Sequence, residues 1–118
     1  MDNKAFIFDS LKLLEKHQKL KEIQWLTESY FCEVMFGITW EDEVGAKLSI
    51  LKKLYPQFNM ETEIKSKNGK NVYYSEEIFL DGVPYLVYNN FLPAIREKYS
   101  DWLKEVFDKD NLELFEKE

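Results

Sequence analysis

Apolar residues in the first half of the chain recur at helical spacing. Over 3–18 they form one broad stripe, with charged residues opposite. A second stripe runs over 20–36 and stops at Gly37, a residue type common just after a helix; the aromatic and β-branched residues of 30–36 leave a strand open there as the alternative. A third stripe over 40–55 begins at carboxylates, which favour a helix N-terminus, and ends before a proline. The pattern predicts about three N-terminal helices.

The period changes to two over residues 60–88, as is typical of strands. Two turn dipeptides, Asn68-Gly69 and Asp81-Gly82, divide this region into three runs, and both suit the positive φ angles of a type I′ hairpin. The second turn pairs Phe79 with Pro84, and the proline restricts its strand to an edge position or to the strand's start. The region therefore predicts a three-stranded antiparallel meander.

Helical spacing returns after residue 90. The apolar stripe there consists of Leu92, Ile95, Tyr99, Trp102, Leu103 and Val106. It predicts one long C-terminal helix over about 90–107, whereas 110–117 form either a short terminal turn or a frayed end. The expected fold class is α+β: about three N-terminal helices, the meander and the long helix, in a single compact domain over 1–118.

The composition indicates what type of protein this is and where in the cell it is expected. The 118 residues suit one domain, and 45% hydrophobic with 16% aromatic residues supply enough apolar material for a core. No apolar run approaches the ~18 residues of a membrane span, and the N-terminus lacks the features of a secretory signal. Cys32 is the single cysteine, so no internal disulfide forms. We therefore expect a cytoplasmic protein with no membrane contact.

The charge argues against direct nucleic-acid binding. The formal net charge is −6 and the isoelectric point is about 4.9, whereas nucleic-acid-binding domains usually carry a basic patch. Of the 16 basic residues only Arg96 is an arginine, the side chain that grips phosphates and guanine in a bidentate fashion.

The residue types that carry catalysis are isolated in the sequence. His17 is the only histidine and lies in a polar stretch at a helix end, so it has no predicted partner for acid–base work or metal binding. Cys32 lacks nearby basic residues to lower its pKa, which predicts a buried, unreactive thiol. The four glycines are scattered and form no phosphate-binding loop. We predict no catalytic residue, no metal site and no cofactor, and expect that the chain is not an enzyme.

Charge is distributed unevenly along the chain. Residues 22–46 contain six acidic residues and no basic one, whereas 1–21 carry a net +2 and 101–118 a net −4. Acidic clusters with aromatic anchors are typical of surfaces that bind basic proteins. Trp40 is the best candidate anchor, because it lies off the apolar stripe of its segment. The candidate partner-binding residues are Glu22, Glu28, Glu33, Trp40, Glu41, Asp42 and Glu43. The alternative is a solvated surface that serves only solubility.

These features favour a small acidic cytoplasmic inhibitor. The expected function is that of a bacterial immunity protein, which neutralises a basic, nuclease-type toxin by covering its active or substrate-binding surface. Two alternatives stay open: a phage-encoded inhibitor of a host defence nuclease, or a non-catalytic adaptor or oligomerisation domain. The sequence leaves the oligomeric state undetermined.

Overall fold

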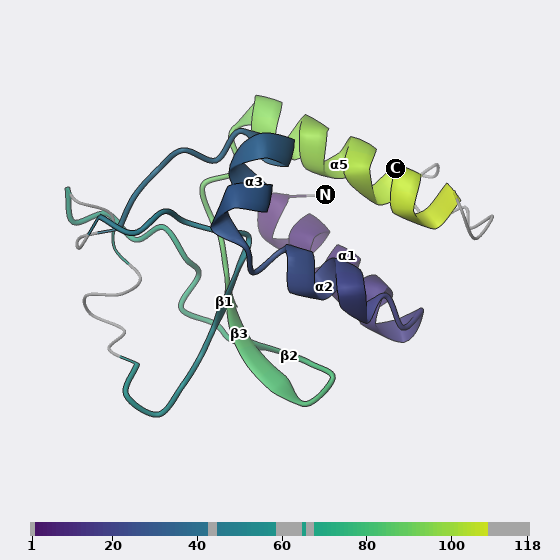
Figure 1. The fold of residues 1–118 in the computed structure, drawn as a ribbon, viewed down its shortest axis with the longest axis horizontal. Helices are drawn as coiled ribbons and strands as arrows, with labels where there is room; N and C mark the ends of the chain where they lie inside the picture. Colours follow the sequence, from purple (N-terminus) through teal and green to yellow (C-terminus); the bar gives the residue numbers. More distant parts are fainter. Residues whose placement is uncertain (1, 43–44, 59–64, 66–67, 109–118) are drawn as a thin grey trace.

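Three N-terminal helices, a small antiparallel sheet and a long C-terminal helix make up the fold, which confirms the α+β layout (Figure 1). The computed structural model describes residues 2–42, 45–58, 65 and 68–108. The helices lie together on one side, and the sheet extends away from them (Figure 1). Glu43 and the predicted terminal turn over 110–117 lie outside the described residues.

The first three helices are α1 (Asn3–Lys16), α2 (Leu20–Trp25) and α3 (Ser29–Phe36). The carboxylate of Asp2 begins α1 by accepting a hydrogen bond from the Ala5 amide at 2.8 Å. Residues 30–36 are helical, and Gly37 ends α3 with a φ of 75°, as expected of a glycine at this position. The predicted helix over 20–36 is nevertheless two helices.

The break between α2 and α3 has a local cause. Thr27 turns its hydroxyl back to the Gln24 carbonyl at 2.7 Å, and Glu28 takes an extended ψ of 114°. This change of direction lets the rings of Trp25 and Phe31 stack at a centroid distance of 5.2 Å. The third N-terminal helix is therefore α3.

The predicted helix over 40–55 is wrong. Its first half is an irregular arm, and its second half contains the short strand β1 (Leu51–Lys53). Leu48, Ser49, Ile50 and Leu51 are all buried, a run that one helix face cannot bury. Residues four apart also lie on the same face of an extended strand, so the apolar spacing fits a strand as well as a helix. Burial of both faces of this segment favours the extended form.

The three-stranded sheet is antiparallel but is not the predicted meander. Its strand order is β1-β3-β2, with β2 at Ile78–Leu80 and β3 at Val83–Val87. The strand that pairs with β3 on its other side is residues 51–53, whereas the first run of the predicted meander, from residue 60 to 67, lies outside the described residues except for Lys65. Toward the Asn68-Gly69 turn, an isolated bridge joins Lys65 and Asn71.

The second hairpin matches its prediction. Asp81 and Gly82 have φ angles of 54° and 77°, as a type I′ turn requires, and Phe79 pairs with Pro84. Pro84 is the second residue of β3, and β1 ends opposite Tyr85. On the β1 side of β3, Pro84 therefore lies just beyond the last paired residue. Its missing N–H removes no hydrogen bond between these two strands.

The long helix α5 (Pro93–Asp108) closes the core, and its position confirms the predicted C-terminal helix. Its Tyr99 is fully buried and contacts four other aromatic rings edge-on or tilted: Phe6, Phe36, Phe91 and Trp102. The Tyr99 hydroxyl lies 2.8 Å from the Ser10 hydroxyl of α1, which in turn donates to the Ile7 carbonyl at 2.7 Å. One side chain thereby holds α1, α3 and α5 together.

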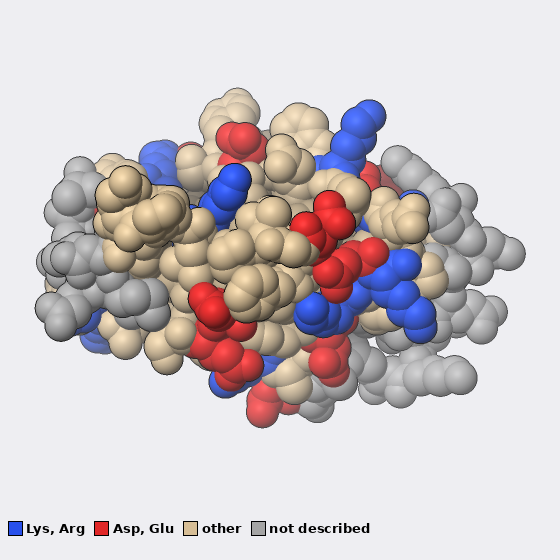
Figure 2. All heavy atoms as spheres, turned by 90° about the horizontal axis from the view of Figure 1, so that it is seen from below, with Lys and Arg blue, Asp and Glu red and all other residues tan. Residues whose placement is uncertain are grey.

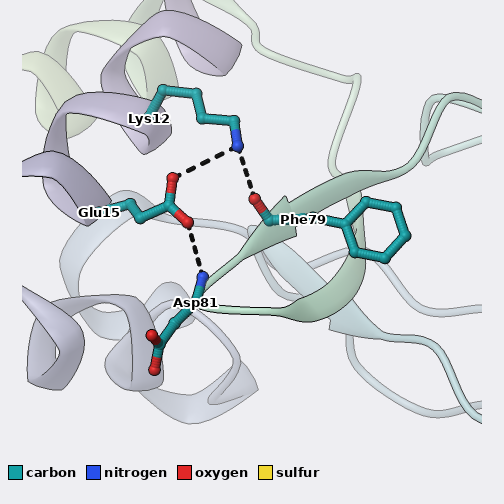
Figure 3. A network of polar contacts seen from close by, with 4 residues as sticks. All are labelled: Lys12, Glu15, Phe79 and Asp81. Carbon is teal, nitrogen blue, oxygen red and sulfur yellow. Dashed lines mark hydrogen bonds and ion pairs between the residues drawn. The ribbon is translucent and has the colours of Figure 1, made fainter.

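A polar network fastens the hairpin to α1 (Figure 3). Lys12 donates to the Phe79 carbonyl at 2.7 Å, and the Asp81 amide donates to the Glu15 carboxylate at 2.7 Å. Lys12 and Glu15 also form an ion pair at 3.3 Å. The bond from Asp81 lowers the pKa of Glu15 below its ordinary value, and Lys12 acts in the same direction. Glu15 of α1, 66 residues earlier in the chain, therefore holds the turn in place.

The buried contacts of Tyr99 predict how substitutions at this position change the free energy of unfolding. Tyr99→Phe keeps the ring but removes its hydroxyl, so we expect the free energy of unfolding to fall by about 1 kcal/mol. Tyr99→Ala also removes the ring contacts and should cost about 3–5 kcal/mol. Urea unfolding measures both, and the double variant with Ser10→Ala isolates the hydroxyl pair. A neutral Tyr99→Phe would contradict this role for the hydrogen bond.

The network at Glu15 predicts acid sensitivity. Because the folded-state pKa of Glu15 lies below its unfolded value of about 4.5, its stabilisation is present above that pH and is lost as the pH falls through the folded pKa. The stability difference between wild type and Glu15→Gln should therefore shrink from neutral pH to about pH 3. Urea unfolding at several pH values tests this, with the exposed Glu77→Gln as control. A difference that is constant with pH would contradict it.

Candidate functional site

A short arm between α3 and β1 carries four of the seven candidate residues. The segment after α3 runs away from the helices before it returns to β1 (Figure 1). The two sides of the arm are joined by a bridge between Glu41 and Lys47 and by a bond from the Leu48 amide to the Trp40 carbonyl at 3.1 Å. Trp40 is 44% exposed on this arm, as its prediction as an anchor requires.

Asp42 shapes the arm and is not part of its outer surface. Its backbone amide donates to the Ala46 carbonyl at 2.8 Å, and its carboxylate accepts from the Ala46 amide at 2.9 Å. Gly45, with a φ of 86°, donates to the Asp42 carbonyl at 3.1 Å. Asp42 is only 4% exposed. The side chain that was predicted to contact a partner instead stabilises the turn that presents Trp40.

The other candidate carboxylates do not form one cluster. Glu33 on α3 pairs with Lys47 at 2.7 Å, so the fold brings a cation to a segment that has none in sequence. Glu22 lies on α2, and Glu28 is exposed just before α3. Trp40, Glu41 and the Glu33–Lys47 pair belong to the arm region, whereas Glu22 and Glu28 belong to the region of α2.

A groove between α2 and α3 is the second surface feature, and it is not among the features predicted from the sequence. It has a volume of about 640 Å³, and its lining consists of Lys21, Gln24, Trp25, Glu28, Tyr30, Phe31, Val34 and Met35. Two signals could have revealed it. Residues 21, 24, 25 and 28 follow helical spacing on α2 and the turn after it, and α3 is apolar on nearly every side.

Positive and negative side chains are mixed on the face shown in Figure 2. Uncharged side chains cover much of the centre of this face, and acidic and basic groups are interspersed around them. A net charge of −6 therefore does not appear there as one continuous acidic sheet. On this face, recognition of a basic partner would depend on local groups of carboxylates.

His17 and Arg96, whose residue types often take part in catalysis or binding, both make contacts within the protein. His17 caps the end of α1, and its ring packs edge-on against Phe107 at 5.9 Å. Arg96 donates to the Asn3 side chain at 2.7 Å and lies over the Phe6 ring at 4.4 Å. The only arginine therefore connects α5 to α1.

Cys32 is buried, as predicted. Its thiol lies 3.5 Å from the Leu26 carbonyl and accepts a hydrogen bond from the Ile50 amide at 3.4 Å. Burial raises the pKa of this thiol to about 12. Within the described residues, no group of three or more His, Cys, Asp and Glu side chains is placed to hold a metal ion. No helix in the same part of the chain is both long and apolar enough to cross a membrane.

The environment of Cys32 predicts an inert thiol. With a pKa of about 12, only about one thiol in ten thousand is ionised at pH 8, and the sulfur is also shielded. A thiol-specific chromogenic reagent should therefore label the folded protein far more slowly than a free cysteine standard. Labelling should reach the standard's rate in unfolding concentrations of urea. Fast labelling of the folded chain would contradict the buried site.

Comparisons with protein-family models, with curated proteins and with solved structures find no significant match to this chain.

Proposed function

We propose that the chain is a small binding protein that inhibits a basic, nuclease-type protein, with the arm around Trp40 as its contact surface. An immunity protein against a bacterial toxin is the specific form of this proposal. The observation that carries it is the exposed indole of Trp40 on an arm whose backbone is closed by hydrogen bonds.

The arm has the properties of an inhibitory anchor. Tryptophan is enriched among the residues that dominate binding energy, because a large rigid ring fills a pocket with little loss of side-chain entropy. Here the backbone beside Trp40 is fixed by the Leu48 amide, and the turn beyond it is fixed by Asp42. The described part of the arm around Trp40 therefore needs little ordering on binding, which favours affinity.

The charge around the arm supports a basic partner. Glu41 flanks Trp40 in the chain and the buried Asp42 follows it, whereas Glu33 in the same region is paired with Lys47 and Glu22 and Glu28 lie by α2. A nuclease binds phosphates through basic side chains, and carboxylates at the same position compete with the substrate for them. Such an inhibitor needs no catalytic residue of its own.

Capture and titration test the proposal. The tagged chain is used to isolate its partner from source cells, and the purified partner is then titrated with wild type and variants at several salt concentrations. We expect a basic protein whose nuclease activity disappears at equimolar inhibitor and whose association slows as salt rises. Trp40→Ala should weaken binding by at least ~2 kcal/mol, and Glu41→Lys should slow association.

Matched controls come from the hairpin region. Phe79→Ala removes an aromatic ring of similar exposure, 50%, and Glu77→Lys makes the same charge change at another exposed site. Both should bind like wild type. If these controls weaken binding as much as the arm variants do, or if the captured partner keeps its activity in the complex, the proposed function is wrong. An inhibitor encoded by a phage would give the same binding results, and the identity of the captured nuclease distinguishes it.

A further inference from the structure

The outer face of α3 is apolar and uncovered. Cys32 and Phe36 point into the core, whereas Tyr30 and Val34 are 77% and 62% exposed on the opposite side. Across the groove, Trp25 is 51% exposed and is held in position by its stack on Phe31. A helix that is apolar on nearly every side is normally buried all round, and monomeric proteins rarely leave such a continuous patch in water.

The charged residues of the groove define what can fill it. Lys21 lies in the first turn of α2 and Glu28 lies just before α3, and both are exposed and line the groove. Within the described residues, neither side chain has an ion pair with another side chain. An occupant that brings an anion to Lys21, a cation to Glu28 and apolar side chains to the rest of the lining would complement the groove in charge as well as in shape.

A second copy of the same face meets these requirements. In a twofold contact, residue i of one copy meets residue j of the other, and j meets i. Antiparallel alignment of two α2 stripes places each lysine against a glutamate, and Gln24 and Trp25, which lie between them in the chain, then meet their counterparts. The same face also holds both a hollow and a projecting aromatic ring, Tyr30, so that each copy can fill the groove of the other.

We propose that the groove between α2 and α3 is the contact between two copies of this chain, related by a twofold axis that places Lys21 of each copy against Glu28 of the other. This dimer contact is separate from the arm around Trp40. Each copy in the dimer therefore keeps its arm available, and the proposal stands or falls independently of the inhibitor function.

Charge reversal and charge exchange test the contact. The dimer dissociation constant is measured by sedimentation equilibrium in about 0.15 M salt, where long-range repulsion between two acidic chains is screened. Lys21→Glu and Glu28→Lys should each weaken the dimer roughly tenfold, because the twofold axis makes each substitution create two contacts between like charges. The double variant that carries both changes should return to within about threefold of wild type. Val34→Glu, at the apolar centre, should weaken the dimer about a hundredfold.

Two control variants carry the same charge changes elsewhere. Lys53→Glu on β1 and Glu77→Lys near β2 are both exposed, and they should leave the dimer unchanged. Circular dichroism checks that every variant is folded. The proposal is overturned if wild type stays monomeric at the highest concentration that it tolerates, which would leave the groove to a different protein. It is also overturned if Val34→Glu dimerises normally, or if the double variant is as weak as the single ones.

Discussion

The burial of the Tyr99 hydroxyl is the constraint on which the helical half of the structure depends. A fully buried phenol needs a hydrogen-bond partner, and Ser10 of α1 supplies it at 2.8 Å. The ring also contacts Phe6 of α1 and Phe36 of α3. Because one rigid side chain has to satisfy all these contacts together, it sets the rotation of α5 about its own axis and the distance of both other helices from it.

This arrangement decides which surfaces stay open. The side of α3 that faces α5 is occupied by Phe36, so its remaining apolar residues face outward beside α2. The Cys32 thiol on the same helix accepts a hydrogen bond from the Ile50 amide. This bond fixes the residue before β1 and therefore the base of the arm. Two exposed surfaces of different character follow from one helix: a largely apolar groove on its outer side, and an arm with an exposed tryptophan where the chain leaves its end.

Features set by local chemistry could be predicted from the sequence, and features set by distant contacts could not. The positive φ angles of Asp81 and Gly82 follow from the residues themselves, as does the long apolar stripe of α5. Residues 40–55 have a helix-like pattern, but their conformation depends on contacts with other segments. Trp40 was found because it lay off that pattern, whereas the ion pair of Glu33 with Lys47 and the burial of Asp42 depend on the folded arm. The groove was missed because its exposed aromatic residues have the composition of a core.

The contacts between α1 and α5 also bear on the order of folding. The hydrogen bonds between Asn3 and Phe91, between Ser10 and Tyr99 and between Asn3 and Arg96 join residues 88, 89 and 93 positions apart. During synthesis the first helix therefore leaves the ribosome long before the segment that covers its apolar face. Closing loops of this length is entropically costly and slows folding. The apolar stripe of α1 has to stay out of other associations until α5 has been made, a period in which chaperones commonly bind such segments.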